Sequence, residues 1–186
     1  VGAEVGVSSY IITFMTKIHG IGNSQSFWSD GSYMNHVFPS KTALVVALFW
    51  LFQAFGRLII SQMMKYVSER KIFIFHSLCT VIALITAIVG NANTALVAFA
   101  FVGYFTCASF TSIFSAAINS FDENHGTISG ILGTAIVGGA FVGWLVGFTG
   151  QLSSMEWGMM INILAFIYVF ALSYFGKGKL DINENK

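Results

Sequence analysis

The chain has 186 residues, of which 55% are hydrophobic and only 9% are charged, and its formal net charge is +1 at pH 7. Soluble domains carry roughly 25% charged residues, and a chain of this size with a mean hydropathy of +0.75 could not hide its apolar side chains in one core. The composition therefore excludes an ordinary soluble domain and predicts an integral, multi-pass membrane protein with the lipid bilayer as its surroundings.

Six apolar runs follow one another, and a helix of about 20 residues is enough to cross a bilayer. Strands of a membrane barrel are only ~10 residues long and alternate in polarity, so runs of this length favour helices. We predict an all-α fold with six transmembrane helices in one bundle over residues 1–176, followed by a charged tail on the cytoplasmic side at 177–186. The expected spans are residues 1–18, 42–64, 72–90, 95–119, 127–149 and 157–176.

The first run is barely long enough to span, and its one acidic residue is Glu4. It begins directly in apolar sequence without a methionine, so we expect that its first turns are missing and that the chain is part of something longer. The polar, turn-rich residues 17–40 are expected to form a loop on the side away from the cytoplasm.

The second run contains Arg57, whose charge has a high free-energy cost inside a membrane span. It lies ~11 Å from the cytoplasmic end of its span, and a charge at that depth is expensive unless it faces a cavity or a partner. Glu4 should reach a similar depth and pair with it, while Gln53 lies one turn away on the same helix face. We expect Glu4, Gln53 and Arg57 to line a substrate or ion pathway; a structural ion pair or a snorkelling arginine is the alternative.

Other polar or small residues inside the runs have less specific interpretations. His76, Asn119 and Asn162 are possible secondary lining of the same pathway, or hydrogen-bonding contacts between helices. Gly139, Gly143 and Gly147 in the fifth run have the spacing that allows close helix packing, and Gly130 precedes them in the same run.

Basic residues set the orientation, since they concentrate in cytoplasmic loops. With six spans, one side carries Lys65, Arg70, Lys71, Lys177, Lys179 and Lys186, whereas the other carries Lys17 and Lys41. The loop between the second and third spans and the C-terminus are therefore predicted to be cytoplasmic. The sequence does not indicate which membrane holds the protein.

The sequence lacks the residue patterns that several classes of protein require. His19, Asp30 and His36 have no tight metal-ligand spacing, and neither do Cys79 and Cys107. There is no phosphate-binding glycine loop, no nucleophile elbow and no basic-aromatic patch for nucleic acid. We expect no enzyme activity, no metal, no cofactor and no nucleic-acid partner.

Three segments resemble one branch of a known transporter superfamily. The resemblance is to fucose/glucose/galactose permease-like and sodium-dependent glucose transporter-like members of the major facilitator superfamily. Their seventh helix is similar to residues 1–5 (VGAEV) with 8–10 (SSY), their eighth helix to residues 49–59 (FWLFQAFGRLI), and their eleventh helix to residues 128–140 (ISGILGTAIVGGA). The resemblance covers essentially the whole chain and implies the C-terminal six-helix half of such a transporter.

The resemblance carries two departures. The superfamily's loop pattern of glycine, an Asp-Arg pair and basic residues is reduced here to Ser61, Lys65, Ser68, Arg70 and Lys71, with Lys65 at the position of the acid. The carboxylates that couple sugar to a cation in the resembled symporters belong to the N-terminal half, which this chain does not contain.

The resemblance implies a secondary-active transporter for a hexose-like sugar with a coupling cation. It would work by alternating access between this half and a second six-helix half. The alternative is a transporter-derived structural subunit of a larger membrane complex that no longer transports. A third possibility is a self-associating half-transporter whose two copies face each other.

Overall fold

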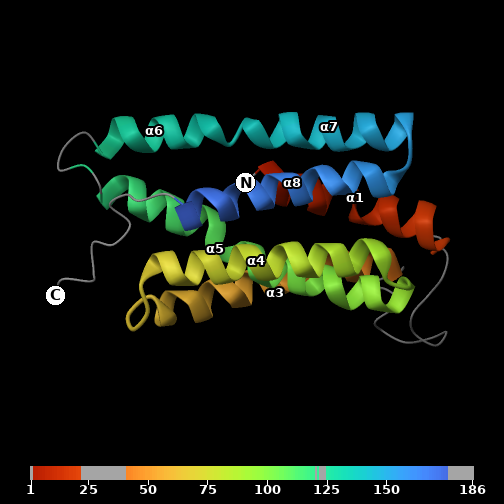
Figure 1. The fold of residues 1–186 in the computed structure, drawn as a ribbon, viewed down its shortest axis with the longest axis horizontal. Coiled ribbons are helices and arrows are strands. Elements are labelled where there is room, and N and C mark those ends of the chain that lie inside the picture. The colour runs from red at the N-terminus through yellow and green to blue at the C-terminus, as the bar shows by residue number, and fades with distance from the viewer. Residues whose placement is uncertain (1, 22–40, 120, 122–124, 176–186) are drawn as a thin grey trace.

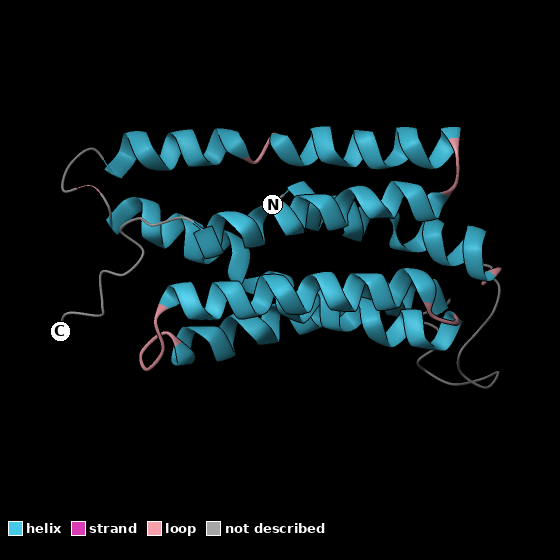
Figure 2. Ribbon diagram, viewed as in Figure 1, coloured by secondary structure: helices cyan, strands magenta, loops and turns pink. Residues whose placement is uncertain are grey.

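The computed structural model describes residues 2–21, 41–119, 121 and 125–175 (Figure 1). All regular secondary structure in this described part is α-helix (Figure 2). Most of the expected outer loop, including Asp30 and His36, and the expected tail at 177–186 lie outside the described residues.

Seven helices are described, and we keep the labels of Figure 1. They are α1 (Gly2–His19), α3 (Lys41–Met63), α4 (Glu69–Val89), α5 (Ala92–Asn119), α6 (His125–Ala135), α7 (Gly138–Leu152) and α8 (Met155–Phe175). Five segments of the described chain are long and apolar enough to cross a membrane: Thr42–Met63, Arg70–Val89, Ala92–Ser115, His125–Leu152 and Met155–Phe175. Helix α1 is not among them.

The helices run roughly along one common axis in three groups (Figure 1). Helices α3, α4 and α5 pack together at one side, and α6 and α7 lie end to end at the opposite side. Helices α1 and α8 lie between them: α1 packs on α7, α8 and α3, while α8 packs on α7 and α4. The bundle is therefore joined through α1 and α8.

The segment expected as the fifth span consists of two helices with a break between them. The turn at Ile136 and Val137 separates α6 from α7, and Ile136 N donates to Gly133 O at 3.1 Å. Helix α7 packs on α1 and α8, whereas α6 contacts α5 and has no buried residue in the described part of the chain. The C-terminal part of this segment is therefore the part that holds it to the bundle.

The core lies where the α3–α5 group meets α1 and α8. It contains fully buried Phe14 from α1, Phe49 from α3 and Phe99 from α5, and the Phe14 and Phe99 rings meet edge-to-face with centroids 5.7 Å apart. Helices α3 and α5 approach so closely that a Cβ at Gly103 would collide with the carbonyl oxygen of Phe49. Such backbone contacts are the usual way in which membrane helices gain packing energy, because lipid supplies no hydrophobic driving force between them.

Arg70 joins the start of α4 to the end of α8. Its Nε donates to the carbonyl of Ser173 at 3.2 Å and its Nη2 donates to the carbonyl of Tyr174 at 3.1 Å. The last carbonyls of a helix lack partners within the helix and carry partial negative charge. Arg70 therefore caps α8, in addition to the orientation role expected from its charge.

Candidate functional site

Glu4 lies in the interior near the middle of the bundle. Helix α1 begins about halfway along the bundle (Figure 1), so its first turn carries Glu4 to that depth. The residue is only 7% exposed. A carboxylate so far from water needs partners, and two side chains of α3 supply them.

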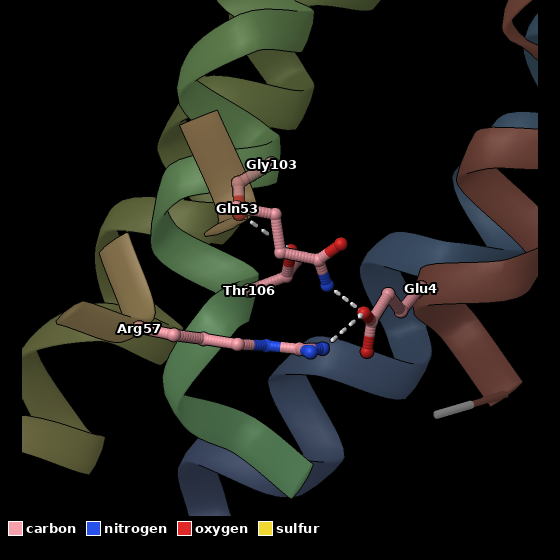
Figure 3. A network of polar contacts seen from close by, with 5 residues as sticks. All are labelled: Glu4, Gln53, Arg57, Gly103 and Thr106. Atoms are coloured by element: carbon pink, nitrogen blue, oxygen red, sulfur yellow. Dashed lines mark hydrogen bonds and ion pairs between the residues drawn. The ribbon is translucent and has the colours of Figure 1, made fainter. Parts of the chain in front are cut away.

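Gln53 and Arg57 both reach across from α3 to the same oxygen of Glu4 (Figure 3). The amide Nε2 of Gln53 donates a hydrogen bond to Glu4 Oε1, and Arg57 Nη2 lies 3.8 Å from the same atom. Residues four apart lie on one face of a helix, so the spacing of Gln53 and Arg57 points both at α1. These three residues are the polar cluster, and the structure brings together the residues that the sequence singled out.

Helix α5 supports the polar cluster from behind. A Cβ at Gly56, the residue before Arg57, would lie 2.6 Å from Cys107 Sγ and 3.1 Å from the carbonyl oxygen of Tyr104. Thr106, beside Gln53 in Figure 3, donates its own hydroxyl to the carbonyl of Gly103 at 3.0 Å. Close packing of α3 on α5 therefore fixes the height and rotation at which Gln53 and Arg57 meet Glu4.

The two charges of the cluster differ in their exposure. The side chain of Glu4 is 9% exposed, whereas that of Arg57 is 49% exposed. The long side chain of Arg57 thus extends over the surface of the bundle while its end is held by Glu4. An arginine about 9 Å from the end of α3 would be costly against hydrocarbon, so the surface beside it should face water or protein.

The other polar residues expected at the pathway have contacts elsewhere. His76 is buried on α4, where its Nδ1 lies 2.9 Å from the carbonyl of Ile72 and its ring lies against Tyr104 and Phe105. Asn162 is fully buried on α8, and its Nδ2 points at Met159 Sδ at 3.8 Å. Asn119 is the last residue of α5, and its side chain lies outside the described part of the structure.

The four glycines expected in helix packing have different surroundings. A Cβ at Gly147 would collide with the Tyr10 hydroxyl of α1, and Gly139 is buried. A Cβ at Gly130 or Gly143 would meet no described atom within 4 Å. Gly147 therefore packs against α1, whereas Gly130 and Gly143 have open space beside them in this bundle.

Sequence reasoning missed two other glycines that make close contacts. Gly103 lies against Phe49, and a Cβ at Gly6 of α1 would lie 2.5 Å from Asn162 Oδ1. Neither belongs to the spaced glycine series that draws attention to the fifth run. The spacing of Gly2 and Gly6, four residues apart, could have indicated the contact at Gly6, whereas Gly103 has no such partner four residues away.

The described residues contain no group of three or more His, Cys, Asp or Glu side chains that could hold a metal ion. The polar cluster instead offers a carboxylate, an amide and a guanidinium within reach of one another. Such groups donate to and accept from the hydroxyls of a polar solute.

Comparison with known proteins places this geometry in context. Residues 2–184 match the Major Facilitator Superfamily. A glucose/galactose transporter of Brucella abortus is 28% identical over 169 residues, which cover 91% of this chain and 38% of that protein. A putative glucose/galactose transporter of Helicobacter pylori is 26% identical over 179 residues, which cover 92% of this chain and 40% of that protein.

The chain thus spans about two-fifths of the length of these curated relatives. No solved structure matches it.

Proposed function

Because the chain belongs to the Major Facilitator Superfamily, we propose that it is the C-terminal half of a secondary-active transporter for a hexose-like sugar. In this proposal a second six-helix half completes the protein. The two halves expose a central site alternately to the two sides of the membrane, and a cation is transported with the sugar.

One observation carries the proposal: Arg57 is half exposed although it lies deep in a membrane span and is held by a buried carboxylate. Lipid would make this arrangement expensive. A water-filled cavity between two halves would make it favourable, since it lets the guanidinium contact water and substrate. The polar cluster would then be part of the wall of that cavity.

The chemistry of the cluster suits a neutral polyol. A sugar hydroxyl is both donor and acceptor, and Arg57, whose side chain is half exposed, offers several N–H donors in a fixed plane. Gln53 and Glu4 are buried, so their part in this proposal is to hold Arg57 in place. The names of the relatives, glucose/galactose transporters, support the same substrate class.

Uptake of radiolabelled glucose and galactose into proteoliposomes tests this function, with the chain reconstituted together with its second half. We expect uptake by the unmodified protein. Uptake should fall at least about tenfold in Arg57→Lys, since tenfold corresponds to 1.4 kcal/mol and lysine cannot reproduce the planar array of donors.

The matched control is Arg70→Lys, which keeps a cation at the end of α8 and should leave uptake close to normal. The proposal is wrong if the unmodified protein takes up no hexose, or if Arg57→Lys behaves like the control. The structural-subunit alternative predicts the first of these results.

A further inference from the structure

We propose that the outer face of α4 and α5 holds one acyl chain of a membrane phospholipid, with the ester region of that lipid at the turn between the two helices. This inference concerns a lipid and not the transported solute. It therefore does not depend on the sugar specificity proposed above.

A groove of about 590 Å³ lies between α4 and α5, which lie side by side in Figure 1. Ile82 on α4 and Val97 and Phe101 on α5 line it, and these side chains are 56%, 53% and 45% exposed. In a membrane protein an apolar groove at the surface of the bundle is filled by hydrocarbon. The question is whether its shape holds one chain in preference to others.

The groove faces away from the polar cluster. Thr106 and Gly103 lie on the face of α5 that meets α3 beside Gln53 (Figure 3). Val97 and Thr106 are separated by about two and a half helical turns, so they lie on opposite faces of α5. Phe101 in the groove wall meets Phe52 of α3 with ring centroids 5.9 Å apart, so we expect a second half over the polar cluster to leave open the side of the groove that carries Ile82 and Val97.

The ends of the groove match one leaflet of a bilayer. It extends along α5 from Asn93 to Phe105, a rise of about 18 Å, and one leaflet of a ~30 Å hydrocarbon core is about 15 Å thick. Asn93 and Thr94 stand at the α4–α5 turn, where the ester groups of a phospholipid are found. Phe105 and Cys79 lie at the other end, toward the middle of the span.

The walls of the groove are apolar, although Thr86 is one of the residues that line them. The Thr86 hydroxyl donates to the carbonyl of Ile82 at 2.8 Å, so that hydrogen bond is satisfied within α4. Phe101 and Phe105 are stacked with their centroids 6.2 Å apart, which gives one wall a rigid aromatic surface. At the turn, a Cβ at Gly90 would lie 2.8 Å from Thr94 Cγ2, so α4 and α5 come close together there.

Lipid tails are as apolar as the groove, so burial alone favours no particular chain. Retention has to come from van der Waals fit to preformed walls and from polar contacts at the Asn93 and Thr94 end. A phospholipid meets both requirements, because it joins an acyl chain to ester oxygens that accept hydrogen bonds.

Native mass spectrometry of the membrane-extracted protein after delipidation in detergent tests this inference. We expect one phospholipid to remain bound per chain. Thr86→Phe places a ring inside the groove and should lower lipid occupancy about tenfold, which corresponds to about 1.4 kcal/mol. Val97→Phe fills the groove from the opposite wall and should act in the same way.

The matched control is Thr134→Phe on α6. Thr134 is also an exposed threonine whose hydroxyl donates to its own helix, to Ile131 O at 2.7 Å, but it lies outside the groove. This variant should keep the lipid, and thermal unfolding should show that all three variants are folded. The inference is overturned if the unmodified protein retains no lipid, or if both groove variants retain as much lipid as the control.

Discussion

Arg57 of α3 lies with its Nη2 3.8 Å from Oε1 of Glu4 on α1, and the acid is buried while the arginine is half exposed. This pair adds a polar contact to the packing of α1 on α3, where α1 otherwise packs mainly with α7 and α8 and α3 packs mainly with α5. The contact has two separable consequences, one for stability and one for transport.

The first prediction concerns the coupling between these two charges. Glu4→Gln and Arg57→Gln should each lower stability, because each leaves a charge in the membrane without its partner. The double variant should lose less than the sum of the two, with a coupling energy of about 1–2 kcal/mol. Thermal unfolding of the four proteins in the same detergent measures it. Strict additivity would show that the pair contributes nothing.

The second prediction concerns the crossing of α3 and α5. Gly103→Ala puts a Cβ against the carbonyl of Phe49, and because backbone cannot move aside easily we expect a loss of about 1–3 kcal/mol. Gly130→Ala is the control, since a Cβ there meets no described atom within 4 Å, and alanine is favoured over glycine in a helix by about 0.5–1 kcal/mol. The melting temperature should fall for the first variant only.

The third prediction concerns Arg70 as the cap of α8. Arg70→Met removes two hydrogen bonds to the last carbonyls of that helix and should cost about 1–2 kcal/mol. Lys65→Met removes a basic residue from the turn before α4, where the lysine is exposed and contacts Gln62. Both changes weaken the basic signal for orientation equally, so only the cap distinguishes them. Equal stability of the two variants would contradict the capping role.

The fourth prediction concerns the contact of α1 with α8. Gly6→Ala would place its Cβ 2.5 Å from Asn162 Oδ1, and we expect a loss of about 1–3 kcal/mol from overpacking. Shortening the partner should relieve the clash, so Gly6→Ala should be better tolerated when Asn162→Ala is present. A double-mutant cycle of thermal unfolding checks this; an unchanged cost of Gly6→Ala would be the contrary result.

The fold class could be predicted from composition and run length. The expectation of an all-α membrane protein related to the major facilitator superfamily is confirmed by the helical bundle and by the match over residues 2–184. The proximity of Glu4 to Arg57 also followed from the sequence, because only two charges lie deep in neighbouring spans and an unpaired one would be costly. Their role in transport stays a proposal.

The contacts that set helix rotation could not be predicted. Apolar residues surround most of each run, so no stripe marks which face of α5 meets α3. The contact of Gly103 with Phe49 depends on that rotation. The capping of α8 by Arg70 also depends on helix rotation, because it joins residues far apart in the chain. This capping role adds to the orientation role expected from the charge of Arg70. The break at Ile136 and Val137 also has no proline to announce it.

The central claim is that Arg57 faces an aqueous cavity, and thiol accessibility measures this most directly. We would introduce Arg57→Cys after replacing Cys79 and Cys107 by serine, and treat the assembled protein in membranes with a charged methanethiosulfonate reagent. Leu164→Cys, at an exposed apolar position of α8, is the control for a surface covered by lipid. We predict that the thiol introduced at position 57 reacts and that the thiol at position 164 does not. No reaction at position 57, or equal reaction at the two positions, would contradict the account.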